Sequence, residues 1–318
     1  MSASVEWRPP TPDDLPGIAA LAAASDAHQG ALEATLVDEL ASRLTWDRGI
    51  DAVSRVVTAG SQVVGAGWAR IMATAGMRNW RVLISAFAAP GHAALYGELV
   101  RWLDAAAATD LGPGDVARIE RVLTPSTAAL AADVVVLYES LGYEFFYVEH
   151  EMSCDVASPP TPSDSDGIAI VPWTSARHAE IRDAYNDAFR ERGFEGYQPE
   201  DWADAYHPDD FLPELSFVAL DADRVVGFTL CTVLDDPDEW TDPAIRGAGW
   251  IDTVGVRPSH QGRGVASGLV ARALDALRAS GVDRAVLRVN EDNGRAKGVY
   301  GALGFVIVRQ HVVYRKAG

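Results

Sequence analysis

The chain repeats itself, and this repeat is the feature that most constrains its fold. Tyr138 and Tyr300 are 162 positions apart, and Gly142 and Gly304 are separated by the same interval. In each copy the Tyr-x-x-Leu-Gly segment is followed by an aromatic residue and a strand-like run. An equal spacing at two matched points indicates a duplicated domain.

The stretch between the two copies has the composition of a linker. Residues 157–166 are rich in Pro, Ser and Asp and contain no large apolar side chain. We therefore predict a first domain over residues 1–156 and a second over residues 167–318, each long enough to bury a core.

Hydrophobic patterns predict a similar order of elements in both halves. Each half opens with a short strand that ends in proline, continues with a helical stretch, and contains a hairpin-like pair of strands. The second half then predicts strand, helix, strand, helix and strand over residues 250–256, 264–279, 285–289, 294–303 and 305–314. Because hairpins coexist with strand–helix–strand crossovers, we expect an α/β fold with a mixed, mostly antiparallel sheet flanked by helices in each domain.

The charge balance narrows the choice of partners. The formal net charge is −18 at pH 7, which argues against binding to nucleic acid or to an anionic membrane surface. Two interpretations of the acidity stay open: recognition of a cationic substrate, or plain solvation of the surface.

Cysteine and histidine usage predicts neither a disulfide framework nor a metal site. Only Cys154 and Cys231 are present, so a reducing cytoplasm is the expected compartment. The seven histidines show no metal-ligand spacing, and no signal peptide or membrane-spanning run of ~20 apolar residues is visible. We expect a monomer or a homodimer.

A glycine-bearing turn joins a predicted strand to a predicted helix in the second half. It runs Gln261-Gly-Arg-Gly264-Val-Ala266. Such a turn leaves backbone N–H groups unpaired at the helix start, which favours binding of an anion such as a pyrophosphate. A plain tight turn is the alternative. The turn also matches half of the dinucleotide-binding fingerprint. That motif belongs to the first βαβ unit of its fold, whereas this turn follows hairpins late in the chain.

Combined with residues further along the chain, this turn resembles the GCN5-related N-acetyltransferase (GNAT) superfamily. The matching motif is Val256-x-Pro-x-x-Gln-Gly-Arg-Gly-x-Ala266, followed by Asn293, Tyr300 and Leu-Gly-Phe305. The resemblance covers residues 168–318 and, more loosely, residues 4–155. The chain as a whole is similar to tandem-domain actinobacterial members, the type that includes mycothiol synthase. Two tandem GNAT-like domains, with acetyl-CoA as co-substrate, are therefore implied.

The resemblance also implies where the cofactor would bind. Backbone amides of residues 261–267 would hold the pyrophosphate with added charge from Arg263, and the backbone of Val254 and Val256 would pair with the pantetheine arm. Asn293 would bond to that arm, and Tyr300 would protonate the departing thiolate as a general acid. The expected cofactor-binding residues are Val254, Gly255, Val256, Gln261, Gly262, Arg263, Gly264, Val265, Ala266, Ser267, Asn293 and Tyr300.

Attack of an amine on a thioester needs a base but no enzyme nucleophile. Asp252 lies two residues before Val254, so a regular strand would put both on one face, and burial would raise the pKa of the carboxyl. Asp252 and Tyr300 are therefore the candidate catalytic residues. Pairing of Asp252 with Arg288 is the alternative. Many relatives carry a glutamate two positions earlier, where this chain has Trp250.

Two candidate residues also fit purely structural roles, and the first domain lacks the turn. Tyr300 fits a core tyrosine and Asn293 fits a helix N-cap.

The segment from Pro90 to Leu99 is two residues shorter than its counterpart in the second half, and Glu98 would repel a phosphate. We predict that the first domain is a degenerate copy that shapes the substrate cleft or supports the fold.

The resemblance therefore implies transfer of an acetyl group from acetyl-CoA to a primary amine of a small molecule, by direct attack in a ternary complex. A non-catalytic acyl-CoA-binding or regulatory protein and a protein N-acetyltransferase are the alternatives. The acidic loop 234–249 fits either a substrate lid or a solvated loop. A further set of ring-bearing residues could line the acceptor pocket or belong to the core, and both interpretations stay open: Trp202, Tyr206, His207, Phe211 and Trp240.

Overall fold

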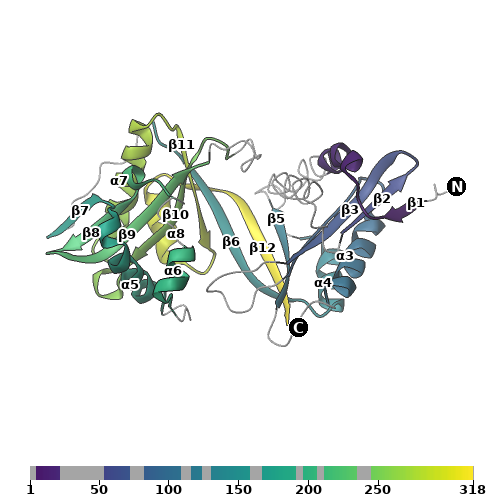
Figure 1. The fold of residues 1–318 in the computed structure, drawn as a ribbon, viewed down its shortest axis with the longest axis horizontal. Helices are drawn as coiled ribbons and strands as arrows, with labels where there is room; N and C mark the ends of the chain where they lie inside the picture. The colour runs from purple at the N-terminus through teal and green to yellow at the C-terminus, as the bar shows by residue number, and fades with distance from the viewer. Residues whose placement is uncertain are drawn as a thin grey trace. The chain divides into compact units, whose positions relative to one another are not determined.

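The computed structural model describes residues 5–21, 54–71, 82–108, 116–123, 130–157, 167–190, 196–205, 211–234 and 245–317. They form two compact units (Figure 1). The first contains the described residues up to Glu149 together with the chain from Arg309 onward, and the second contains the described residues from His150 to Val308. Residues 158–166 of the predicted linker lie outside the described residues, so the domain boundaries stay a prediction.

The first unit is a mixed sheet with helices on it. Its strands lie in the order β1 (Val5–Arg8), β2 (Ser54–Ala59), β3 (Gln62–Ile71), β4 (Val82–Ala88), β5 (Val116–Leu123) and β12 (Val306–Ala317). The pairings are antiparallel except for the parallel pair β4–β5. Helices α3 (Ala93–Ala107) and α4 (Ala132–Ser140) supply Leu99, Leu103 and Tyr138 to a core that includes Ile84 and Ile119 of the strands.

The second unit repeats this plan. Its strand order is β6 (Glu144–Asp155), β11 (Arg284–Asn290), β10 (Gly249–Val256), β9 (Arg224–Val233), β8 (Phe217–Asp221) and β7 (Ile168–Pro172). The pair β10–β11 is parallel, whereas β7–β8, β8–β9 and β9–β10 are antiparallel. The helices are α5 (His178–Phe189), α6 (Pro199–Ala205), α7 (Val265–Ala279) and α8 (Gly294–Ala302).

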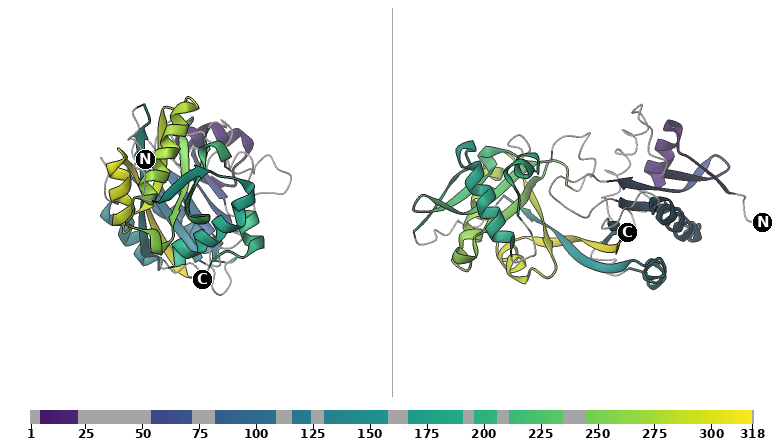
Figure 2. Two further views of the ribbon diagram at one scale, coloured as in Figure 1. Left: turned by 90° about the vertical axis from the view of Figure 1, so that its left-hand side faces the viewer. Right: turned by 60° about the horizontal axis from the view of Figure 1, so that its bottom comes forward.

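Helices α5 and α7 cover opposite faces of the second unit's sheet (Figure 2). Successive strand residues point to opposite faces. Val218 of β8 packs in one cluster with Ile181 of α5, and the next residue, Ala219, packs in another cluster with Val265 and Leu269 of α7. The sheet is therefore buried on both sides, which accounts for the near-continuous apolar sequence of β8 and β9.

The predicted α/β class and the mixed, mostly antiparallel sheets are confirmed. The five elements predicted over residues 250–314 are present, with ends that differ by at most three residues. The strand next to β5 and the strand next to β11 each come from the opposite repeat. β12, which follows the second repeat, pairs antiparallel with β5, and β6, which follows the first repeat, lies beside β11.

The repeated Tyr-x-x-x-Gly segment is a helix-ending motif. In α8 the N–H of Phe305 donates to the carbonyl of Tyr300 (3.0 Å), and the N–H of Gly304 donates to Gly301 (3.1 Å). These are the two bonds of a Schellman motif, whose left-handed residue is Gly304 with φ +90°. The equivalent glycine of α4, Gly142, has φ +82°. The repeat therefore encodes a helix end that orients a tyrosine one turn earlier.

Both cysteines are free and buried, and no helix of the described residues has the length and apolarity needed to cross a membrane. Burial raises the pKa of the Cys154 and Cys231 thiols to about 12, so both stay protonated at neutral pH. The prediction of no disulfide framework is confirmed for this pair.

Substitution of Gly304 by alanine tests the helix-ending motif. Because alanine at φ +90° is strained, Gly304→Ala should lower the free energy of unfolding by about 1–2 kcal/mol. Urea denaturation followed by tryptophan fluorescence measures it. Gly301→Ala, on the same helix with no atom within 4 Å of the new Cβ, is the control and should be neutral or stabilising. Equal effects of the two substitutions would contradict the assignment.

Candidate active site

Strand β10 loses its partner β11 halfway along its length. The pairs Gly249–Ala285, Trp250–Val286 and Ile251–Leu287 are the last between these strands in the described part of the chain, whereas β10 stays paired with β9 as far as Val256. The register with β9 shifts between Ile251 and Thr253, which makes Asp252 the extra residue of a β-bulge. The edge of β10 beyond the bulge therefore faces an opening in the sheet.

The turn after β10 has the predicted glycine geometry. Gly262 and Gly264 have φ values of +76° and +79°, a region that L side chains rarely adopt, and Gly264 is the N-cap of α7. Gly268 donates to the carbonyl of Gly264 (2.9 Å) as the first bond of the helix, so the amides of Val265–Ser267 precede its hydrogen-bond ladder. These N–H groups and the positive end of the helix dipole favour an anion at this turn.

The strand edge, the turn and helix α8 surround one cavity of about 510 Å³. All the predicted cofactor-binding residues except Arg263 line it. The structure adds six lining residues that the sequence did not single out: Ala188, Phe189, His260, Arg295, Ala296 and Val299. Ala188 and Phe189 come from α5, which no short motif links to the cavity because it reaches the cavity only through tertiary packing, whereas the other four adjoin predicted residues of the turn and of α8.

Positive charge at the cavity comes from different side chains than the motif implied. The Arg263 guanidinium lies 3.7 Å from Asp221 and is not among the lining residues. His260 lines the cavity and is hydrogen-bonded through Nε2 to the same Asp221 carboxylate (2.9 Å), which lowers the pKa of that carboxyl. From α8, Arg295 donates to Oε1 of Gln261, whose Nε2 donates to the Val256 carbonyl (3.2 Å).

Asn293 and Tyr300 approach the cavity from α8. The Asn293 side chain accepts a hydrogen bond from the Ala296 amide (3.2 Å), so its predicted N-cap role is confirmed, and it also lines the cavity. Tyr300 is 8% exposed, packs at 5.9 Å from the Phe305 ring, and still borders the cavity. Its core position and a position at the site are therefore compatible.

Asp252 differs from the expectation that it is buried in the strand. The bulge breaks the alternation on which that expectation rested, and the side chain is exposed. The carboxylate accepts hydrogen bonds from the Thr253 hydroxyl (2.7 Å) and the Trp250 indole (3.3 Å). Arg288, the alternative partner, lies 3.7 Å from Glu151 instead.

The first unit carries a large side chain at the position that matches Ala266. When the buried residues of α3 and α7 are aligned at Leu99 and Leu269, Tyr96 corresponds to Ala266. The Tyr96 hydroxyl is hydrogen-bonded to that of Tyr138, which is fully buried, and burial raises the pKa of Tyr138. In this unit a phenol beside the buried tyrosine therefore stands where the other unit has a methyl group.

Two of the aromatic candidates are core residues, and the other candidates lie outside the residues that the structure describes. Trp202 and Phe211 belong to a buried cluster with Ile181 of α5, so the core alternative is confirmed for them. Tyr206, His207 and Trp240, with loop residues 235–244, lie outside the described residues. No group of three or more His, Cys, Asp or Glu side chains within the described ranges is placed to hold a metal ion.

Comparison with solved structures defines the class of fold. The chain superposes on a GCN5-related N-acetyltransferase from Sphaerobacter thermophilus with a TM-score of 0.73 and 22% identity, over 98% of this chain and 95% of that one. A tandem GNAT protein from the clavulanic acid biosynthesis pathway gives a TM-score of 0.65 with 16% identity, over 99% of this chain and 98% of that one. The fold is that of a tandem GNAT protein.

The sequence comparison matches the second unit to a protein family. Residues 178–305 match the sequence profile of the Acetyltransferase (GNAT) family, so the second unit carries a GNAT domain, which belongs to an acyltransferase family. Residues that line the cavity, from Ala188 to Tyr300, fall within the match.

Curated relatives match only part of the chain. Mycothiol acetyltransferase from Beutenbergia cavernae is 44% identical over 75 residues, which are 24% of this chain and 25% of the relative. N-alpha-acetyltransferase 30 from Schizosaccharomyces pombe is 34% identical over 93 residues, 29% of this chain and 58% of the relative. The chain thus spans from a quarter to somewhat over half of the length of these two relatives.

The wall of the cavity depends on the absence of a side chain at Gly255. A Cβ there would lie 2.4 Å from Cε1 of Phe228, a fully buried ring. Gly255→Ala should therefore lower the free energy of unfolding by about 1–3 kcal/mol through overpacking. Thermal unfolding measures it, and adding Phe228→Leu should recover part of the loss. A single substitution without effect would show that β10 shifts freely at this point.

Proposed function

We propose that the second unit transfers an acetyl group from acetyl-CoA to a primary amine of a small molecule. One observation carries the proposal: the separated edge of β10, the anion-binding turn and Tyr300 border the same cavity. The three features supply places for a strand-like arm, a pyrophosphate and a leaving group in one continuous space. A Rossmann-type site would lack the separated strand edge.

The residues at the turn fit the phosphate end of acetyl-CoA. Gly262 leaves open space, since nothing lies within 4 Å of where its Cβ would be. The amides of Val265–Ser267 and the guanidinium of Arg295 offer donors to phosphate oxygens. Arg263 would reach the phosphates only after leaving Asp221. The fit therefore rests on backbone groups more than on the motif arginine.

The strand edge fits the pantetheine arm. Peptide groups of Val254 and Val256 lie beyond the last β10–β11 pair, and the arm's amides would pair with them as an added strand does. An N–H group of this edge would donate to the thioester carbonyl oxygen as charge develops there. The side-chain amide N–H of Asn293 would bond to the arm while its Oδ1 caps α8.

In the proposed reaction the amine nitrogen forms a bond to the thioester carbon and the carbon–sulfur bond breaks. The Tyr300 hydroxyl gives its proton to the departing sulfur. The proton lost by the amine passes through water to Asp252, whose exposed carboxylate does not line the cavity. Direct attack needs no nucleophile from the protein.

The class of acceptor is inferred from the charge of the protein and from its similarity to relatives. A small amine is favoured by the match to a mycothiol acetyltransferase, and a peptide N-terminus is the second candidate, favoured by the match to an N-alpha-acetyltransferase. The net charge of −18 would raise the local concentration of either acceptor in its cationic form. A screen of small amines beside short peptides separates them.

Replacing the proposed acid tests the chemistry. Tyr300→Phe should lower kcat by ~10²-fold or more, because the thiolate would leave unprotonated, while the Kd for acetyl-CoA changes little. Steady-state kinetics with an acceptor from the screen, beside calorimetry, measures both. Tyr138→Phe, the equivalent change in the first unit, is the matched control and should not affect turnover. Unchanged kcat in Tyr300→Phe would remove Tyr300 from the mechanism.

The large side chain of Tyr96 in the first unit suggests a blocking substitution for the second. Ala266→Tyr should abolish acetyl-CoA binding, because the new phenol would occupy the cavity that Ala266 lines. Calorimetric titration of the parent should give one site per chain, and Tyr96→Ala should leave that site unchanged. Two sites in the parent would show that the first unit also binds. No site would refute the proposed function.

A further inference from the structure

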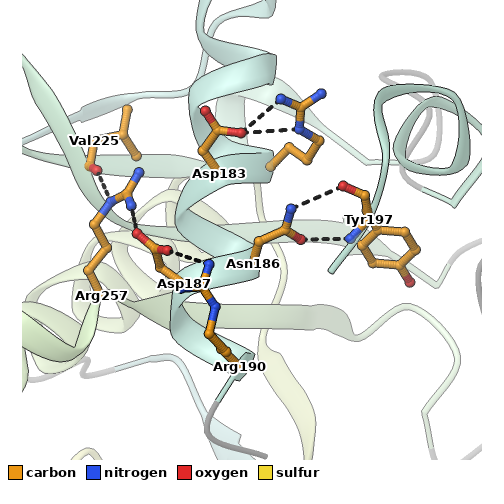
Figure 3. Close-up of polar contacts among 8 residues, drawn as sticks. Asp183, Asn186, Asp187, Arg190, Tyr197, Val225 and Arg257 are labelled. Carbon is orange, nitrogen blue, oxygen red and sulfur yellow. Dashed lines mark hydrogen bonds and ion pairs between the residues drawn. The ribbon is translucent and has the colours of Figure 1, made fainter. Parts of the chain in front are cut away.

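Helix α5 carries two adjacent polar residues that hold two separate segments of the chain (Figure 3). Asn186 makes a two-way contact with the backbone of Tyr197: its Nδ2 donates to the carbonyl (3.0 Å), and its Oδ1 accepts from the N–H (2.8 Å). Gly196 packs closely on this amide, since a Cβ there would lie 3.2 Å from Cγ of Asn186. The segment that leads into α6 is therefore fixed to α5.

Asp187, the next residue, accepts a hydrogen bond from Nη1 of Arg257 (Figure 3). Arg257 also donates through Nε to the carbonyl of Val225 (2.8 Å) and through its backbone N–H to Val226 (2.9 Å). The second oxygen of Asp187 accepts from Arg190 (3.2 Å). This network ties α5 to β9 and to the residue that directly follows β10.

The pair between Asp187 and Arg257 is sensitive to loss of one partner. Arg257 is only 7% exposed, and burial lowers the pKa of its guanidinium. A buried charge that loses its partner is strongly destabilised, so the structure around it must rearrange to restore a partner or water. Such a rearrangement would act where β10 leads into the turn, four positions before Gln261.

Both anchored segments connect to residues that line the cavity of the proposed active site. Ala188 and Phe189, which directly follow Asp187, line it beside Val254 and Gly255. The Tyr197 ring packs on Tyr185 at 5.4 Å, and Tyr185 packs on Phe189 at 4.4 Å, so the segment that Asn186 holds reaches the cavity wall through these rings. Burial and then the negative charge of Asp252 raise the pKa of Tyr197. The Tyr197 ring also packs on Trp202 of α6 at 5.5 Å.

We propose that Asn186 and Asp187 are positioning residues of the acetyl-transfer site. Asp187, through Arg257, sets the wall of the cofactor cavity, and Asn186 sets the segment on the acceptor side. The inference rests on the proposed function, and it goes further by assigning one helix the alignment of both substrates. Neither residue needs to touch a substrate to do so.

The two residues should affect different steps. Asp187→Asn should weaken the Kd for acetyl-CoA about 10-fold, because the wall formed by Ala188 and Phe189 is displaced from the arm. Asp187→Glu, which keeps the carboxylate, should recover most of the affinity. Asn186→Ala should leave this Kd within about twofold and lower kcat/KM for the amine by about 10-fold. Calorimetry with acetyl-CoA alone and steady-state kinetics give the two readouts.

Asp183→Asn is the matched control. Asp183 lies one turn earlier on α5, influences Arg257 by its charge, and bonds to Arg182 (2.8 Å) instead. The same change of charge there should leave the Kd within about twofold. Should Asp187→Asn not fold, as judged by circular dichroism, Arg257→Lys keeps the charge without the Nε donor and should weaken binding in the same way.

The outcomes separate this inference from the proposed function. Parent protein that binds no acetyl-CoA refutes both. Parent protein that binds, with Asp187→Asn equal to the parent or equal to Asp183→Asn, overturns the positioning role and leaves the proposed function in place. Loss of acetyl-CoA affinity in Asn186→Ala would overturn the division of labour between the two residues.

Discussion

The early end of the β10–β11 pairing is the constraint on which the rest of the site depends. A parallel pair that continued to Val256 would satisfy the edge of β10 within the sheet and leave no opening. The bulge at Asp252 bends β10 where the pairing stops, and Gly255 leaves room for the ring of Phe228 on the neighbouring strand β9. The cavity, the exposed strand edge and the approach of α8 all follow from this separation.

The charge distribution shows how an acidic protein can offer a site for an anion. Backbone amides at the start of α7 carry partial positive charge, which does not depend on the acidic side chains elsewhere on the surface. Arg295 and His260 add cationic or polar donors beside them, and Asp221 holds Arg263 aside. Local geometry therefore supports phosphate binding despite a net charge of −18.

Duplication produced two helix ends with the same geometry in different surroundings. The Schellman bonds that follow Tyr138 and Tyr300 are equivalent, so each tyrosine is presented from the last turn of its helix. The units differ in the turn before this helix, which in the first unit is two residues shorter, and at the helix position that holds Tyr96 in one unit and Ala266 in the other. A large side chain there completes a core, and a small one leaves a cavity.

Local sequence determined the parts whose physical cause is local. Glycines with positive φ at Gly262, Gly264 and Gly304, the N-cap at Asn293, and the apolar face of α7 were all predictable, because turn and cap chemistry depends on neighbours along the chain. The mixed α/β sheet followed from the order of hairpins and crossovers.

Only the tertiary structure decided what depends on distant partners. It placed Asp252 on a bulge and left it exposed, and it exchanged β6 and β12 between the units. It also brought α5 to the cavity through Asp187 and Arg257. Such pairings have no period or spacing in the sequence, since each is set by which buried group finds a hydrogen-bond partner once the sheet has formed.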